Sequence, residues 1–242
     1  KYPATAGAPD DEKMYQTVVV SEPDTTGKSS SKAFWKFDAS RGDTAYDEYG
    51  NHPGTIHGAS WTEGYVSYGL EFDNNDHVSV TNTSKLNSAI SFSWTAWIKT
   101  NSNGTILARA GANSKWEKGG KCFFVNQEGT LTFQVAGIGK ITSDTLVNDG
   151  SWHHVAMSAN IRTGPDQVRF YVDGNPAGKG ELNVNRFPEE GLPVQIGYCN
   201  DDFPESSGFE GLMDEVRWYD YVIGEEELKG INFRRLSLPE EL

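Results

Sequence analysis

Asp214 is the residue whose type and setting point most directly to chemistry. It lies in a run of alternating residues, and alternate residues of a strand face opposite sides of a sheet. This alternation predicts that Asp214 shares a face with Val216 and Trp218, which we expect to be the core side. Because a buried carboxylate without compensation is costly, Asp214 needs a cation, an arginine or a set of N–H donors. Pairing with Arg217 or Arg41 and a hydrogen-bonded turn stay open as alternatives to a bound cation.

Two segments that we expect to be loops carry aromatic and polar side chains together. Ligand sites combine apolar surface with a few placed polar groups, and sugars stack on aromatic rings while bonding to amides and carboxylates. The candidate ligand-binding residues are Trp116 in the first segment and Tyr198, Asn200, Asp201 and Asp202 in the second. Each aromatic residue could equally be an apolar plug that closes one end of the fold.

Five histidines invite a metal or catalytic interpretation. His153 and His154 are adjacent, so on a strand they face opposite sides and cannot chelate one ion together. The remaining three, His52, His57 and His77, lie in turn-rich sequence without a Cys or Asp partner at ligand spacing. We therefore expect structural histidines and no zinc site.

The composition excludes several classes of partner. The 242 residues carry 21 Lys and Arg against 34 Asp and Glu, a net charge of −13, so the basic footprint of a nucleic-acid-binding protein is missing. No window approaches the roughly 18 apolar residues of a membrane helix, so we expect no membrane insertion by this chain. Hydrophobic residues make up only 36%, and 29 aromatic residues offset this shortage in the core.

The elements that must position these residues are short strands. Phe92, Trp94, Ala96 and Ile98 alternate with mostly polar residues, which predicts a half-buried strand. Similar runs recur along the chain, and Asp173-Gly174 is a strong hairpin signal. Short strands separated by turns predict an all-β fold, a two-sheet antiparallel β-sandwich of the jelly-roll type.

Composition also divides the chain into segments. Residues 1–30 are poor in large apolar groups and read as a flexible linker, in which residues 17–20 could add a short strand. Residues 31–230 form the predicted jelly-roll domain, and residues 231–242 a C-terminal tail. The only helix that we expect is about one turn at residues 224–228.

The two cysteines, Cys122 and Cys199, lie 77 positions apart and do not have metal-site spacing. They form either one disulfide across the fold or two free, small core residues. Spacing does not decide between these alternatives, because it does not show whether the Cα atoms come within bridging distance.

The order of the strand motifs resembles one family, the laminin-G-like jelly rolls of the concanavalin A-like lectin/glucanase superfamily. The resemblance covers about residues 33–230. It rests on six pieces in order: GLEFD at 69–73, FSWTAWIK at 92–99, GSWHHVA at 150–156, FYVDG at 170–174, IG at 196–197 and FEGLMDEVRWY at 209–219. This resemblance implies two antiparallel sheets, an extracellular or cell-surface location, and often a structural Ca²⁺. Function varies widely among members, so the fold alone assigns none.

The resemblance also gives Asp214 a partner. It implies that Asp214 and a residue of the N-terminal strand, here Asp38, hold a structural Ca²⁺. Ca²⁺ takes 6–8 oxygen ligands, so backbone carbonyls and water would complete the shell.

A catalytic site is not expected. The related glucanases place two glutamates on one strand in an E-x-D-x-x-E pattern, and the sequence has no such string. It also lacks a G-x-S-x-G elbow and a phosphate-binding loop. The sequence therefore predicts a non-catalytic extracellular recognition domain whose partner is a glycan. The alternatives are a protein-interaction or spacer module that binds a surface or extracellular protein and, as a minor one, a glycoside hydrolase.

Overall fold

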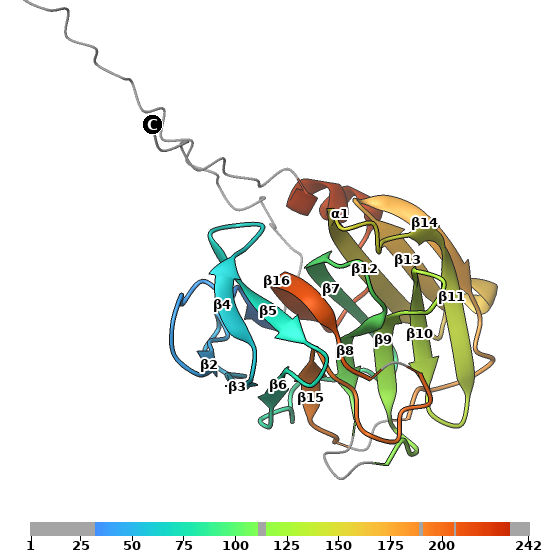
Figure 1. Ribbon diagram of the computed structural model, residues 1–242. Coiled ribbons are helices and arrows are strands. Elements are labelled where there is room, and N and C mark those ends of the chain that lie inside the picture. Colours follow the sequence, from blue (N-terminus) through green and yellow to red (C-terminus); the bar gives the residue numbers. More distant parts are fainter. Residues whose placement is uncertain (1–31, 111–114, 189–190, 206, 233–242) are drawn as a thin grey trace, which may run out of the picture.

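The computed structural model describes residues 32–110, 115–188, 191–205 and 207–232. The expected linker at 1–30, its strand at 17–20 and most of the expected tail lie outside the described residues. Within them, two antiparallel sheets of eight strands lie face to face (Figure 1). The predicted fold class, an all-β two-sheet sandwich, is confirmed.

The first sheet, sheet A, contains the long strands of the middle of the chain and its last strand. Its order is β14 (Asn175–Gly180), β13 (Val168–Val172), β12 (Trp152–Asn160), β7 (Ser91–Lys99), β16 (Glu210–Tyr219), β5 (Tyr68–Asp73) and β4 (Ser60–Glu63). β1 (Ala33–Trp35) pairs with the C-terminal part of β16, so the first and last strands of the domain are neighbours.

The second sheet, sheet B, covers the other side of the core. Its order is β11 (Gly139–Leu146), β10 (Thr130–Val135), β9 (Lys121–Val125), β8 (Gly104–Arg109), β15 (Val194–Ile196), β6 (His77–Val80), β3 (Gly54–His57) and β2 (Thr44–Ala45). Some neighbours are consecutive strands, but others, such as β7 with β16 and β8 with β15, come from distant parts of the chain, because jelly-roll strands cross between sheets.

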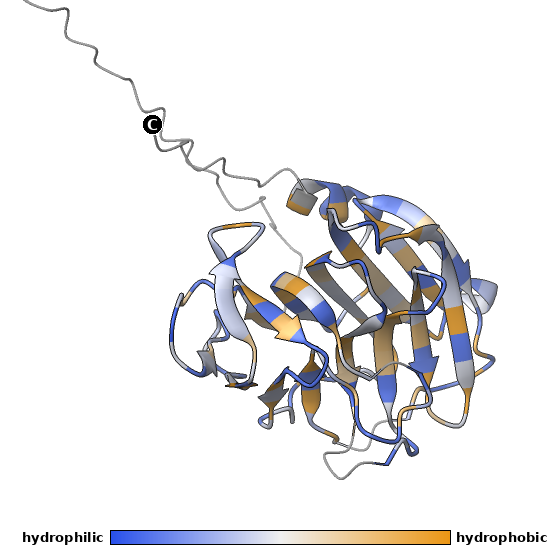
Figure 2. Ribbon diagram, in the orientation of Figure 1, coloured by the Kyte–Doolittle hydropathy of each residue, from blue (hydrophilic) through white to orange (hydrophobic). Residues whose placement is uncertain are grey.

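The core between the sheets is formed by alternate residues of each strand, as expected. Phe92, Trp94, Ala96 and Ile98 of β7 all belong to the core cluster, and the ring of Trp94 lies 4.9 Å from that of Trp218. Figure 2 shows this alternation of apolar and polar residues along the strands. Aromatic rings fill much of the space between the sheets, which compensates for the low hydrophobic fraction.

The expected hairpin between β13 and β14 is present. Asp173 has φ of 52° and Gly174 has φ of 77°, the left-handed values that a two-residue type I′ turn requires. The carboxylate of Asp173 also accepts a hydrogen bond from the backbone N–H of His154, which ties the turn to β12.

Helical structure among the described residues is limited to α1 (Glu225–Asn232) and the 3-10 turn η1 (Gly164–Asp166). α1 has eight residues rather than the single turn expected, because Leu228 and Ile231 pack with Tyr171 and Tyr219 on the outer face of sheet A. Neither described helix is long and apolar enough to cross a membrane.

Candidate functional site

A β-bulge in β16 decides where Asp214 lies. Asp214 pairs with Trp97 of β7, but Arg217 pairs with Thr95, so β16 has one residue more than its partner between these pairs. Glu215, at this point, has φ of 53°, in the left-handed region. An extra residue of this kind shifts the alternation of side chains along the strand.

The bulge reverses the face of Asp214. Met213 and Val216 both pack in the core, so Asp214 faces outward from sheet A. The prediction that Asp214 shares a face with Val216 and Trp218 is therefore wrong. The side chain is nevertheless fully buried, because the turn between β4 and β5 covers it.

Backbone donors surround the Asp214 carboxylate. The backbone N–H of Val66 donates to Oδ2 at 2.8 Å and that of Glu215 donates to Oδ1 at 2.7 Å. Burial raises the pKa of Asp214 to about 8 in spite of these hydrogen bonds. Arg217 forms its ion pair with Glu215, at 2.6 Å, and not with Asp214. No ion pair joins Asp214 to any Lys or Arg within the described part of the chain.

Asp38 lies at the same turn. Its carboxylate accepts hydrogen bonds from the Ser67 hydroxyl and from the backbone N–H of Tyr68, and burial raises its pKa above the ordinary value. Asp38 is also close enough to Asp214 for its charge to help raise the pKa of Asp214. The structure thus brings together the two residues expected at a metal site, although they come from opposite ends of the domain.

The donor set at this turn fits a hard cation. Two carboxylates and the Ser67 hydroxyl are all oxygen donors, which are the ligands that Ca²⁺ prefers. A divalent cation would favour the charged form of both carboxyl groups, whose pKa values burial raises. No group of three or more His, Cys, Asp or Glu residues among those described has metal-holding geometry, so further ligands would be hydroxyl, carbonyl or water oxygens.

The same turn holds an aromatic cluster on the outer face of sheet A. The ring of Tyr65 stacks on Trp97, with centroids 3.4 Å apart, and meets Trp152 edge-on at 5.9 Å. Tyr65 therefore packs the β4–β5 turn against β7, whose Trp97 is paired with Asp214. These rings are themselves mostly covered.

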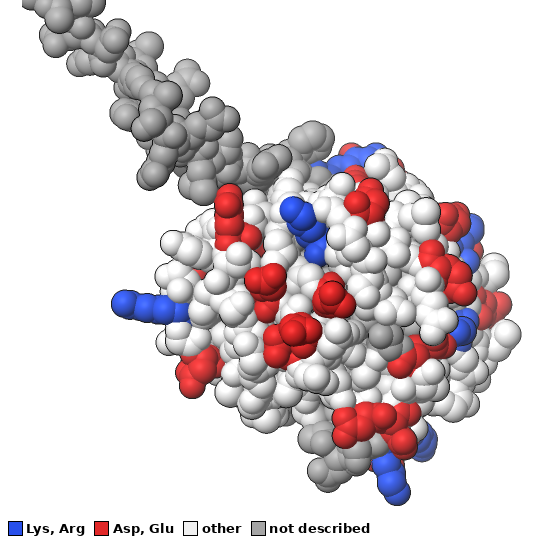
Figure 3. Space-filling view, viewed as in Figure 1, with Lys and Arg blue, Asp and Glu red and all other residues white. Residues whose placement is uncertain are grey.

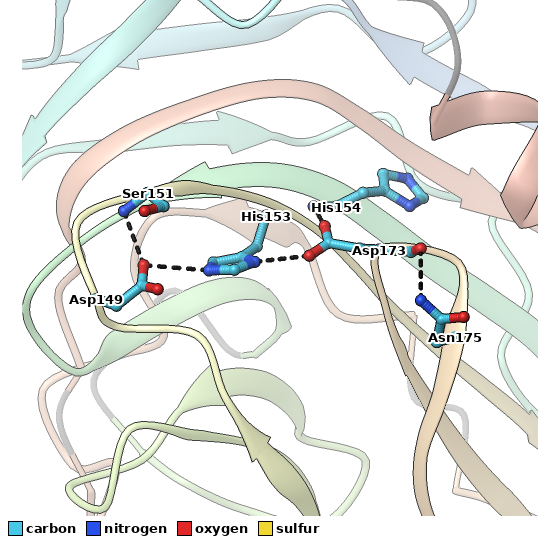
Figure 4. A network of polar contacts seen from close by, with 6 residues as sticks. All are labelled: Asp149, Ser151, His153, His154, Asp173 and Asn175. Carbon is cyan, nitrogen blue, oxygen red and sulfur yellow. Dashed lines mark hydrogen bonds and ion pairs between the residues drawn. The ribbon is translucent and has the colours of Figure 1, made fainter.

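His153 is held between two carboxylates at the end of β12. Figure 4 shows Nε2 of His153 directed to Asp149 and Nδ1 directed to Asp173, at 3.2 and 2.8 Å. The hydrogen bond with Asp173 is the main cause of a raised His153 pKa. The network ties the loop before β12 to the β13–β14 turn, which is a structural role, as expected for this histidine.

His154 faces the other way and is fully buried beside Trp97, with ring centroids 5.2 Å apart. Neither of its ring nitrogens has a hydrogen-bond partner. Burial lowers the pKa of His154 to about 3, so the ring is neutral at physiological pH. The pair does not chelate a common ion.

Two of the five candidate ligand-binding residues have packing roles. Trp116 lies over the outer face of sheet B with its ring 4.8 Å from that of Phe203, as an apolar plug would. The Asn200 side chain is buried, and its Nδ2 donates to the carbonyl oxygen of Lys115 at 3.0 Å. These contacts hold the two loops together.

Tyr198, Asp201 and Asp202 lie nearer to solvent. The Tyr198 hydroxyl donates a hydrogen bond to the carboxylate of Asp201, and Tyr198 is half-buried while both aspartates are exposed. The Tyr198 ring lies 5.7 Å from the ring of His77. Tyr198 and Asp201 thus lie beside a histidine that the sequence did not connect with them.

A row of three rings crosses the outer face of sheet B. His57 of β3 and His77 of β6 are paired in the sheet and stack with centroids 4.4 Å apart, and Tyr198 follows. Next to the row, the Ser79 hydroxyl lies 2.8 Å from Nε2 of His57. The neighbouring Gln195 is paired with Ser79 and has a buried side-chain oxygen without a hydrogen-bond partner.

A polar groove of about 620 Å³ lies on the outer side of sheet A at the end of β5. Its polar lining includes Glu71, Asp73, Asp76, Glu210 and Lys99. Figure 3 shows acidic side chains gathered over β5 and the adjacent part of β16. Carboxylates of this kind accept hydrogen bonds from hydroxyl and amine donors.

Asp76 connects the groove with the row of rings. It lines the groove, its carboxylate lies directly over Gly58, and its charge acts on His77. We call the combined region the rim surface, which consists of Glu71, Asp73, Asp76, Lys99, Glu210, His57, His77, Tyr198 and Asp201. Sequence reasoning missed the histidines, because only the pairing of β3 with β6 brings them together.

Two antiparallel sheets packed face to face, with the first and last strands adjacent, define a jelly-roll β-sandwich. The laminin-G-type family model described as the concanavalin A-like lectin/glucanases superfamily matches residues 72–229. The chain belongs to this family. The predicted resemblance is confirmed.

Relatives among curated proteins match a smaller region. The rat protein "Sushi, von Willebrand factor type A, EGF and pentraxin domain-containing protein 1" (Rattus norvegicus) is 32% identical over 113 residues. The mouse protein of the same name (Mus musculus) is 31% identical. The match covers 45% of this chain and 3% of each of these relatives.

Solved structures share the fold at low identity. Domain 4 of AbnA, an extracellular arabinanase from Geobacillus stearothermophilus in complex with arabinotriose, has a TM-score of 0.64 at 17% identity, over 83% of this chain and 97% of that one. The ligand-binding domain of botulinum neurotoxin serotype D in complex with N-acetylneuraminic acid has a TM-score of 0.57 at 11% identity, over 84% and 50%.

Proposed function

We propose that the chain is a non-catalytic, extracellular carbohydrate-binding domain and that its ligand binds along the rim surface. The observation that carries the proposal is the row of three rings beside Asp76, a residue that also lines a groove rich in hydrogen-bond acceptors. The C–H faces of a sugar pack on aromatic rings, and its hydroxyls donate to carboxylates and amides. The two halves of the rim surface supply both kinds of contact.

The chemistry of the groove favours a neutral or cationic glycan. Four of its lining residues are acidic and one is basic, so an anionic sugar would meet net repulsion. The unpartnered oxygen of Gln195 adds an acceptor beside the rings. The solved relatives with arabinotriose and N-acetylneuraminic acid support carbohydrate binding by this fold, while their identities are too low to transfer a sugar.

We propose that Asp38 and Asp214 hold a structural Ca²⁺. Bound there, the ion would supply a positive charge beside the buried Asp214 and the more exposed Asp38, and would tie the start of the domain to its last strand. The role is structural, because both carboxylates lie at the β4–β5 turn and neither lines the groove.

A second candidate function is a protein-interaction or spacer module in a larger extracellular protein. The multi-domain names of the rat and mouse relatives favour it. An interaction module of this kind is expected to expose a contiguous apolar patch. Among the described residues only four large hydrophobic side chains are exposed: Tyr46, Tyr49, Tyr68 and Leu146. This small number favours the glycan as the ligand.

A glycan array probed with the full chain, with Ca²⁺ and with EDTA, tests the proposal. In Ca²⁺ we expect binding to a set of neutral or amino sugars. In EDTA we expect weaker binding, because loss of the structural ion destabilises the fold. Incubation of the bound glycans should release no shorter products. Absence of glycan binding in Ca²⁺ would contradict the proposed function, and product release would contradict its non-catalytic character.

A further inference from the structure

The two cysteines of the chain meet on the outer face of sheet B. Cys122 lies in β9 and Cys199 follows β15, and both side chains are buried. The thiol of Cys199 lies within hydrogen-bonding distance of that of Cys122. Both are free thiols in this structure. Residues 77 positions apart in the sequence are thus in direct side-chain contact.

The strand order explains this contact. Cys122 pairs with Ala108 of β8, and Ala108 pairs on its other side with Gln195 of β15. After β15 the chain turns at Gly197, where φ is 83°, and Cys199 comes to lie in one apolar cluster with Ala108 and Cys122. The fold therefore places the second thiol beside the first.

The segment that carries Cys199 is held by noncovalent contacts with itself, with the Lys115 loop and with sheet B. The backbone N–H of Cys199 donates to Ser207, and Tyr198 forms an isolated bridge with Gly208, so the segment closes on itself as a hairpin. Phe203 is its apolar anchor, packed edge-on against Phe124 of β9 at 5.2 Å. A covalent link at Cys199 would fix the base of this hairpin to the sheet.

We propose that Cys122 and Cys199 form an intramolecular disulfide when the protein folds in an oxidising environment. The oxidant is a low-molecular-weight disulfide such as oxidised glutathione. One thiolate attacks it and releases one small thiol, and the second cysteine then displaces the other small thiol from the mixed disulfide. Two cysteine protons are lost, one S–S bond forms in the protein, and one S–S bond of the oxidant is reduced.

We expect the disulfide to form during folding and not in the folded protein. Burial raises the pKa of the Cys199 thiol far above its ordinary value, so almost no thiolate is present once the cluster has closed. We therefore expect that protein folded under reducing conditions stays reduced for a long time after the reductant is removed. Protein refolded with a glutathione redox buffer should contain the disulfide.

The test uses the full chain, refolded with reduced and oxidised glutathione or with reductant alone. Each sample is denatured in the presence of iodoacetamide, and intact mass and a non-reducing peptide map are recorded. We expect the oxidised sample to take up no alkyl group, to be lighter by two hydrogen atoms before labelling, and to yield one linked peptide containing both cysteines. The reduced sample should take up two alkyl groups.

Two outcomes would overturn the proposal. One is a folded, oxidised sample that still takes up two alkyl groups. The other is a sample that carries glutathione on either cysteine or is linked between chains. A thermal readout is independent of the mass: dithiothreitol should lower the Tm of the oxidised protein by several degrees and leave that of Cys199→Ser unchanged. Equal effects on both proteins would also contradict the proposed link.

Discussion

The carboxylates of Asp38 and Asp214 meet at the β4–β5 turn, although one follows the first strand of the domain and the other lies in the last. The Asp38 carboxylate accepts hydrogen bonds from the Ser67 hydroxyl and from the backbone N–H of Tyr68. The Asp214 carboxylate accepts a hydrogen bond from the backbone N–H of Val66. Desolvation raises the pKa of both carboxyl groups, and among the described residues no Lys or Arg forms an ion pair with Asp214. This relationship is the reason to expect a bound cation.

Calcium should stabilise the fold through these two residues. A ligand that binds only the folded state at a hundredfold excess over its Kd adds about 2.7 kcal/mol to the free energy of unfolding. We expect EDTA to lower the Tm by several degrees and Ca²⁺ to restore it, in differential scanning calorimetry. Asp214→Asn should remove most of this response, whereas Asp144→Asn, at an exposed position of β11, should retain it. A full calcium response in Asp214→Asn would refute the assignment.

Without calcium, Asp214 should make stability fall as pH rises. Its folded-state pKa of about 8 lies above the ordinary value, so the stabilising contribution is complete at pH below about 4 and is lost as pH rises through 8. Urea unfolding in EDTA at pH 5 and pH 8 measures this change. We expect wild type to lose more stability over this interval than Asp214→Asn. Identical losses in the two proteins would show that the carboxyl group is not the cause.

His154 should act in the opposite direction. Its folded-state pKa of about 3 lies below the ordinary value, so its contribution is complete above pH 6.5 and is lost as pH falls toward 3. With an unfolded-state pKa of about 6.5, the loss at pH 5 is about 2 kcal/mol. His154→Phe should lose less stability than wild type between pH 7 and pH 5, measured by urea unfolding in Ca²⁺. His57→Gln, which removes an exposed histidine, is the control. An unchanged pH dependence in His154→Phe would contradict this account.

The buried ion pair between Glu215 and Arg217, at the bulge in β16, should contribute strongly to the stability of the fold. Its side chains are 10% and 6% exposed, and the Arg217 guanidinium also lies over the Phe34 ring at 3.8 Å. Because Glu215→Ala leaves a buried charge without its partner, we expect a loss of about 3 kcal/mol in urea unfolding. Glu205→Ala breaks the more exposed pair with Lys140 and should cost under about 1 kcal/mol. Equal costs for the two variants would mean that burial does not strengthen the pair.

Local sequence patterns predicted the sandwich, because strand alternation and turn residues act over a few positions. The core face of β7 and the Asp173-Gly174 turn are examples. The same alternation failed at Asp214, because Glu215 adopts a left-handed φ without a glycine to signal a bulge. The meeting of Asp38 with Asp214 was implied by the family resemblance and not by spacing.

The ligand surface was predicted less well, since it depends on contacts between distant segments. The sequence left Trp116 open as a sugar platform or an apolar plug, and its packing against Phe203, 87 positions away, favours the plug. His57 and His77 stack only because β3 and β6 pair. Tyr198 and Asp201 remain candidate ligand-binding residues. Tyr198 lies beside His77, which is far from it in the sequence.

The central claim, that the rim surface binds a glycan, is tested most directly by isothermal titration calorimetry with the strongest glycan from the array. Tyr198→Ala removes one ring of the row, while Leu146→Ala removes an exposed apolar side chain from β11 at the opposite edge of sheet B. We expect Tyr198→Ala to weaken binding at least about tenfold, equivalent to about 1.4 kcal/mol, and Leu146→Ala to bind as wild type does. Equal affinities of wild type and Tyr198→Ala, with both proteins folded, would contradict the claim.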